Sequence, residues 1–233
     1  MILQALLLAT ALHAAADPEK PLVFIDPGHG GAESGVKAAG LEEASLTLDM
    51  GRELAKQLKE LKVASQLSRD SNSESPVPSE RARRANASGA KVFVALHVNH
   101  APSPSVHGAR IFIPKPVAGD SAAIRAGQAP LAWKEGAGAW ADESRRIAME
   151  CSASMAPSLA SKPPVQSLQL AAFKGLAMPA LFIEIGFASH AESLERLKDA
   201  AWRGAAMQKL AEALAKSVAA DKAAFPAQTP VAP

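Results

Sequence analysis

The chain has 233 residues, a length that suits one α/β domain with short tails. Apolar residues make up 48% of it, which is enough for a sizeable core and argues against wholesale disorder. The formal net charge is only +2, and no Lys/Arg cluster forms a basic stripe, so we expect no nucleic-acid partner. Cys151 is the single cysteine, which excludes an internal disulfide and a cysteine-based zinc site. Any metal would have to be held by histidines and carboxylates.

The first 16 residues are typical of an export signal. The apolar run from Ile2 to Leu12 is too short to cross a bilayer, which takes about 20 residues. It is followed by Ala14-Ala15-Ala16, the small-residue pattern of a signal-peptidase site, although no basic residue precedes the run. We therefore predict a signal peptide over residues 1–16 and an exported protein, in the periplasm or outside the cell. No stable membrane insertion is expected after its removal.

Strand-like and helix-like patterns then alternate along the chain. Apolar or alternating runs predict strands over residues 22–25, 63–67, 92–96, 110–113 and 181–183. Amphipathic spacing predicts helices over residues 42–61, 79–87 and 142–155, and one or two helices over 193–218. Because several strands are apolar on both faces, we predict a single α/β domain over residues 17–220, a mostly parallel twisted sheet with helices on both faces. Residues 221–233 are a Pro/Ala-rich tail without periodicity.

Polar residues follow the predicted buried strands, and ligands of open α/β sheets gather at the carboxyl ends of the strands. The sequence DPGHGG, with His29, follows the first strand; HVN, with His97, follows the third; and EIG, with Glu184, follows the last. Glu43 stands at the start of the first long helix. Two histidines and one glutamate, with a fourth position open for water, form a known catalytic zinc set, and a further glutamate can act as the base. The pattern therefore predicts a zinc site at this end of the sheet.

Each of these residues also has an ordinary explanation. A single histidine after a strand is usually a hydrogen-bonded rim residue, and Glu43 could merely complement the helix dipole. Glu184 is harder to explain in this way, because its apolar neighbours impose a desolvation cost on an unpaired carboxylate. The agreement of four positions favours a functional site.

The same segments resemble the zinc-dependent N-acetylmuramoyl-L-alanine amidases, the type 3 peptidoglycan amidases. The resemblance follows the family's motif order from about residue 22 to 218, in the sequences VFIDPGHGG, EASLTL, LSRD, VFVALHVN and MPALFIEIGF. It implies one zinc ion per chain, bound by His29, Glu43 and His97, with Glu184 as the catalytic carboxylate. Glu42 leaves an ambiguity of one position, and Glu43 fits the motif better.

The resemblance implies hydrolysis of the amide bond between N-acetylmuramic acid and L-alanine in peptidoglycan, for cell-wall remodelling or daughter-cell separation. Asp26 and Asn99 are candidates for orienting the ligating histidines. Two alternatives stay open: a zinc peptidase that cuts within the stem peptide, and an inactive peptidoglycan-binding module. Peptidoglycan is the expected partner, and the resemblance also allows an activator protein.

The segment 115–141 is long for a connection, since loops above about 15 residues are usually functional or disordered. It contains Trp133 and Trp140, which favours a groove wall where the tryptophans pack on the domain or on the substrate. The alternative is an inhibitory plug in which Glu135 fills the open position on the zinc until a partner moves it, as in some amidases that resemble this chain.

Overall fold

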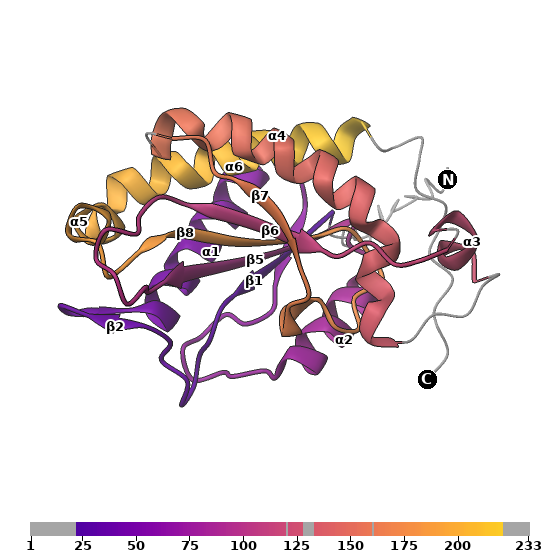
Figure 1. The fold of residues 1–233 in the computed structure, drawn as a ribbon, viewed down its shortest axis with the longest axis horizontal. Coiled ribbons are helices and arrows are strands. Elements are labelled where there is room, and N and C mark those ends of the chain that lie inside the picture. Colours follow the sequence, from indigo (N-terminus) through magenta and orange to yellow (C-terminus); the bar gives the residue numbers. More distant parts are fainter. Residues whose placement is uncertain (1–21, 120, 128–132, 160, 221–233) are drawn as a thin grey trace, which may run out of the picture.

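The computed structural model describes residues 22–119, 121–127, 133–159 and 161–220 (Figure 1). The predicted signal peptide, 1–16, and the predicted tail, 221–233, lie outside the described residues. Within the described part of the chain, none of the helices combines the length and the apolar character that crossing a membrane requires.

A six-stranded sheet forms the centre of the domain, in the order β4-β1-β5-β8-β6-β7 (Figure 1). Its parallel part consists of β4 (Ser65–Leu67), β1 (Val23–Pro27), β5 (Val92–Asn99) and β8 (Ala180–Phe187). β6 (Arg110–Pro114) runs antiparallel to β8, and β7 (Val165–Leu168) runs parallel to β6. The predicted mostly parallel sheet is confirmed. β7 escaped prediction because this short edge strand has no buried residue and no apolar run.

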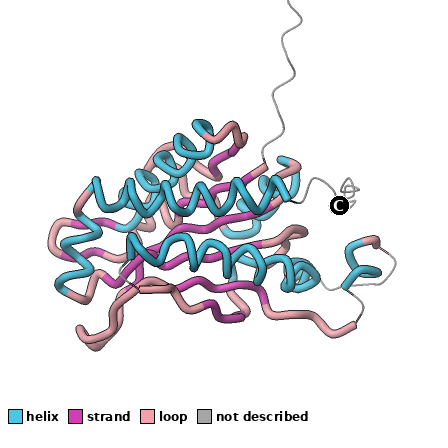
Figure 2. Tube along the Cα trace, turned by 90° about the horizontal axis from the view of Figure 1, so that it is seen from above, coloured by secondary structure: helices cyan, strands magenta, loops and turns pink. Residues whose placement is uncertain are grey.

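Helices cover both faces of the sheet, as predicted. The long helices α1 (Glu43–Glu60), α4 (Ala141–Leu159) and α6 (Ala200–Ala220) share one apolar core with the strands, and Figure 2 shows helices running side by side over them. A smaller core on the other face involves α2 (Pro78–Ser88) and the 3₁₀ helix η2 (Ala171–Phe173). The helix α5 (Ala191–Lys198) follows β8 directly. A short hairpin of β2 (Lys37–Ala38) and β3 (Leu41–Glu42) precedes α1.

The predicted helical stripe explains how α1 is seated. Met50, Leu54 and Leu58 recur at steps of four and are almost completely buried. Leu61 belongs to the same predicted stripe but caps the carboxyl end of α1 and is 44% exposed. This packing fixes the start of α1, and therefore Glu43, against the carboxyl end of the sheet.

The antiparallel direction of β6 decides where the segment 115–141 lies. The carboxyl end of β6 is at the amino ends of β1, β5 and β8, so the segment leaves the sheet there. It contains α3 (Ser121–Arg125) and the 3₁₀ helix η1 (Trp133–Trp140), and α3 lies at the opposite end of the molecule from α5 (Figure 1). The guanidinium of Arg125 donates a hydrogen bond to the carbonyl of Ala139 at 2.8 Å, which ties the two helices together.

Candidate active site

Glycines around His29 allow side chains to approach one another closely. His29 follows β1 with a φ of 59°, in the left-handed region. A Cβ atom on Gly28 would lie 2.3 Å from Cε1 of His97, and a Cβ atom on Gly35 would lie 2.5 Å from Oε2 of Glu43. Gly35 also has a φ of +65°, which favours glycine. The missing side chains therefore leave the space that the three predicted ligands occupy.

Two buried arginines hold this loop through its backbone. Arg69 is 1% exposed and donates hydrogen bonds to the carbonyl oxygens of Pro27 at 3.1 Å, Gly28 at 2.9 Å and Ala44 at 2.7 Å. Arg81 donates to the carbonyl oxygen of His29 at 2.8 Å. The sequence alone predicts no role for either arginine. Arg69 lies in the LSRD motif and Arg81 on a predicted helix, and these positions were the only sequence signal for a role. The carbonyl groups that they bind are brought near them only by the fold.

Asp26 contributes to the same arrangement through Arg81. Its Oδ1 accepts hydrogen bonds from Nη1 of Arg81 at 2.6 Å and from Oγ of Ser68 at 2.5 Å. Asp26 is 2% exposed, so this buried ion pair is enclosed by protein. Asp26 thus supports the backbone of His29 by way of Arg81, and these hydrogen bonds involve neither of the two predicted ligand imidazoles.

Glu43 joins the two histidines. Its Oε2 lies 3.2 Å from Nε2 of His29, and its Oε1 lies 3.0 Å from Nδ1 of His97. The backbone N–H groups of Val36 and Val98 each donate to this carboxylate at 2.9 Å. Glu43 is 1% exposed, whereas Glu42 is exposed and lies 4.0 Å from Lys37. Of these two glutamates, Glu43 is therefore the one that faces the histidines.

The charges at this cluster are mutually dependent. Burial alone would raise the pKa of Glu43, but the hydrogen bonds with His29 and His97 outweigh it and hold the pKa well below its ordinary value. The hydrogen bond to Glu43 in turn raises the pKa of His29. A buried carboxylate of this kind is stable only with a cation or several donors beside it.

The donor set fits a zinc ion. His29, Glu43 and His97 can each present one ligand atom within 4.8 Å of the others, and the described ranges contain no other such group of His, Cys, Asp or Glu. Around a tetrahedral zinc with bonds of about 2.0–2.2 Å, neighbouring ligand atoms lie roughly 3.3 Å apart. The ring nitrogens of His29 and His97 lie 3.2 and 3.0 Å from the carboxylate of Glu43, each from a different oxygen, so the three groups are close enough to share one ion. Two imidazoles and one carboxylate leave a fourth position open for a substrate or water.

Glu184 lies beside the cluster on the next strand. It is the register partner of His97 in the β5–β8 pair, and Asn99 Nδ2 donates to its Oε2 at 2.5 Å. Burial raises the pKa of Glu184, and this hydrogen bond opposes the rise. Asn99 therefore orients Glu184, whereas the sequence predicted that it would orient a histidine. The arrangement places a half-buried carboxylate, suited to proton transfer, next to the three predicted ligands.

Comparisons with known proteins identify the family of the chain. A family model described as N-acetylmuramoyl-L-alanine amidase matches residues 23–216, which is most of the chain. The chain belongs to the N-acetylmuramoyl-L-alanine amidase family. The amidase LytC of Bacillus subtilis is 26% identical over 191 residues, which are 81% of this chain but only 34% of LytC. The uncharacterized protein YqiI of the same species is 26% identical over 215 residues, covering 92% of this chain and 91% of YqiI.

Solved amidase structures share the fold. The N-acetylmuramoyl-L-alanine amidase of Clostridium difficile 630 has a TM-score of 0.68 at 21% identity, over 90% of this chain and all of that one. AmiC2 of Nostoc punctiforme has a TM-score of 0.66 at 22% identity, over 86% and 96% of the two chains. Membership of the amidase family makes this chain an enzyme, and the predicted α/β architecture is the fold of these structures.

The segment 115–141 does not border the amidase site in the described residues. Gly136 packs against the carbonyl of Leu176, and Gly138 against Lys115 and Val117, near the amino end of β8. Trp140 packs under the guanidinium of Arg125, 5.1 Å from the ring centroid. The groove-wall and zinc-plug roles of Glu135, Trp133 and Trp140 stay predictions, and the antiparallel direction of β6 places Trp140 at the amino end of the sheet. The side chain of Trp133 lies outside the description.

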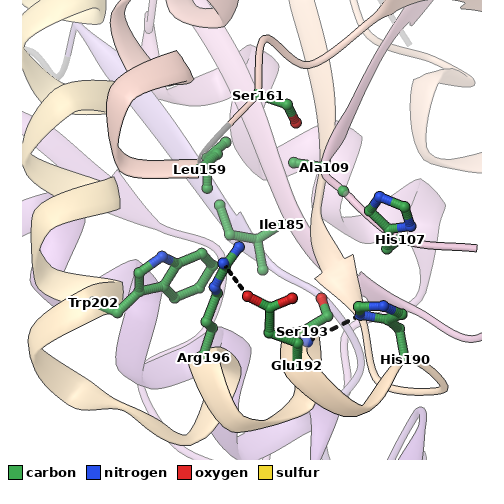
Figure 3. Close-up of a pocket in the computed structure, with 11 residues that line it drawn as sticks. His107, Ala109, Leu159, Ser161, Ile185, His190, Glu192, Ser193, Arg196 and Trp202 are labelled. Atoms are coloured by element: carbon green, nitrogen blue, oxygen red, sulfur yellow. Dashed lines mark hydrogen bonds and ion pairs between the residues drawn. The ribbon is translucent and has the colours of Figure 1, made fainter.

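A separate hollow of about 210 Å³ lies on the α5 side of β8 (Figure 3). Trp202 bounds it on one side, and the stacked rings of His107 and His190, 4.9 Å apart, bound it on the other. Ile185 lines the hollow, whereas the neighbouring Glu184 does not. The residues that line the hollow include none of the three predicted ligands, so the hollow is distinct from the amidase site.

Proposed function

We propose that this enzyme is an exported, zinc-dependent amidase that hydrolyses the bond between N-acetylmuramic acid and the L-alanine of the stem peptide. The observation that carries the proposal is the buried carboxylate of Glu43, which bridges His29 and His97 beside the half-buried Glu184. The family supports the amidase activity, and the apolar start of the chain supports export.

His29, Glu43 and His97 would hold the ion, and the protein provides the geometry before the ion binds. Arg69 and Arg81 fix the backbone on either side of His29, and two backbone N–H groups fix Glu43. When bound, zinc supplies Lewis acidity, which polarises an amide carbonyl and makes a nearby water easier to deprotonate.

Glu184 performs the proton transfers. The carboxylate takes a proton from the attacking water and then delivers it to the departing amine of the stem-peptide alanine. The raised pKa of Glu184 brings the carboxyl closer to the pH at which it both accepts and returns a proton. Asn99 keeps one carboxylate oxygen in place during both transfers.

Digestion of purified peptidoglycan, combined with zinc analysis of the purified protein, tests the proposal. We expect intact stem peptides to be released from unmodified glycan strands, and about one zinc ion per chain. Cleavage within the peptides would instead identify a zinc peptidase. Binding to peptidoglycan without any product would identify an inactive binding module.

An activator protein remains part of the proposal. The CwlD amidase of Clostridioides difficile, which shares the fold at 16% identity, was solved in complex with the GerS lipoprotein. If this chain depends on a partner, the purified protein should digest peptidoglycan slowly and accelerate when an envelope extract of its own source is added.

A further inference from the structure

Arg110 extends the row of charged groups across the carboxyl edge of β1, β5 and β8. In the sheet order, His29 follows β1, His97 is on β5, Glu184 is on β8, and Arg110 begins β6. Arg110 is the antiparallel register partner of Glu184. Directly paired residues of antiparallel strands point to the same face, so the guanidinium lies on the face that carries the catalytic carboxylate.

The guanidinium lies over an aromatic ring, and within the described part of the chain it forms no ion pair. Its Cζ lies 4.8 Å from the centroid of Phe187, whose side chain is 1% exposed. No carboxylate among the described residues lies within ion-pair distance of Arg110, although Glu184 is its register partner. Arg110 is partly exposed. A positioned guanidinium with free donors beside a catalytic group is suited to bind an anion from the substrate.

The proposed chemistry indicates which part of the substrate lies there. Glu184 must reach the nitrogen of the scissile amide to protonate it, so the leaving peptide lies on the Glu184 side of the metal ligands. The next strand on that side is β6, with Arg110. The carboxyl group of muramic acid is consumed in the amide bond, so the glycan side carries no charge near this bond. The stem peptide, in contrast, carries free carboxylates beyond its first alanine.

We propose that Arg110 binds a carboxylate of the stem peptide, on the residue that follows the first alanine, and so selects acidic over amidated peptides. The inference rests on the proposed amidase function and adds a specificity to it. A bidentate guanidinium–carboxylate contact is charge-assisted and directional, and its loss costs roughly 10- to 100-fold in binding.

The test compares two muramoyl peptides that differ only in this group, one with a free α-carboxylate on the second residue and one with a carboxamide. The zinc-loaded wild-type enzyme should have a kcat/KM at least roughly 10-fold higher for the carboxylate. Arg110→Gln should bring the ratio to about one by slowing only the carboxylate substrate. Arg110→Lys should keep part of the preference, because the positive charge remains while the bidentate donor geometry of the guanidinium is lost.

A matched control is Arg145→Gln, which removes an exposed arginine of α4 that hydrogen-bonds Ser167. This variant should retain the wild-type ratio. A wild-type ratio near one, or an unchanged ratio in Arg110→Gln, would overturn the inference while leaving the amidase function intact. The inference would also be overturned if Arg110→Gln lowered kcat/KM equally for both substrates and displaced the acid limb of the pH profile. Arg110 would then act through Glu184. A wild-type enzyme inactive on both peptides, even with the envelope extract added, would refute the proposed function itself.

Discussion

At the scale of single residues, the site depends on one buried carboxylate that serves two histidines. Glu43 is 1% exposed and accepts two backbone hydrogen bonds in addition to its contacts with the rings. A carboxylate with this many fixed donors is preorganised for a cation. The neighbouring Glu42 is exposed and provides a natural control.

Glu43→Ala should abolish tight zinc binding, because two protein ligands are too few to retain a catalytic zinc ion. Glu42→Ala should keep about one zinc ion per chain. Atomic absorption after exhaustive dialysis measures both. The reverse result would move the ligand to Glu42 and contradict the assignment.

Glu184→Gln should keep zinc and the fold but lower kcat by roughly two to four orders of magnitude, the range for removal of a general base. Zinc content and circular dichroism of the variant serve as controls. A near-normal rate would remove Glu184 from the mechanism, and a loss of zinc would make it a ligand.

The pH dependence of kcat/KM should also report on Glu184. Burial raises its pKa above the ordinary 4.5, so the active carboxylate is lost on acidification earlier than for an exposed glutamate. The hydrogen bond from Asn99 stabilises the charged form, and Asn99→Ala removes it. The acid limb of the profile should therefore move to higher pH in this variant. A limb that stays in place or moves to lower pH would be inconsistent with the assigned role of Asn99.

At the scale of elements, the loop between β1 and the β2–β3 hairpin depends on glycines, because a side chain at these positions would clash with its neighbours. Gly28 lies against the ring of His97, so the loop and the end of β5 can approach only without a side chain at this position. The buried guanidiniums of Arg69 and Arg81 then satisfy the carbonyl groups that the loop turns inward.

Gly28→Ala should reduce zinc affinity by at least roughly tenfold, because the added Cβ would displace an imidazole ligand. A competition titration of the apoprotein with a chromophoric chelator measures this affinity without relying on activity. Gly204→Ala in α6 is the control, since an added Cβ there meets nothing within 4 Å. Wild-type affinity in Gly28→Ala would show that the site tolerates the added methyl group.

At the scale of the whole molecule, the site connects segments that are distant in sequence. His29, Glu43, His97 and Glu184 come from three neighbouring strand ends and the start of one helix, so an ion that binds them stabilises the folded arrangement against the unfolded chain. The apolar cores on both sides of the sheet supply the remaining stability.

Removal of zinc should lower the thermal midpoint without unfolding the protein at 25 °C. At a ligand concentration of 100 times Kd, binding contributes about 2.7 kcal/mol. For a domain of 150–250 residues, each kcal/mol shifts Tm by about 2–4 °C. Scanning calorimetry of the chelated and the zinc-loaded protein should thus show a difference of several degrees, which the Glu43→Ala variant should lack. An equal shift in that variant would place the stabilising ion elsewhere.

The sequence by itself determined the alternation of strands and helices and the residues that follow each strand. These are local properties: apolar runs of strand length, helical spacing in α1, and the glycine that ends α2 with a φ of 76°. The tertiary structure alone decided which end of the sheet each loop occupies. Because β6 is antiparallel, Trp140 lies away from the amidase site while Arg110 lies beside Glu184. Strand direction is fixed by pairing between residues 70 to 74 positions apart, and no local pattern encodes it.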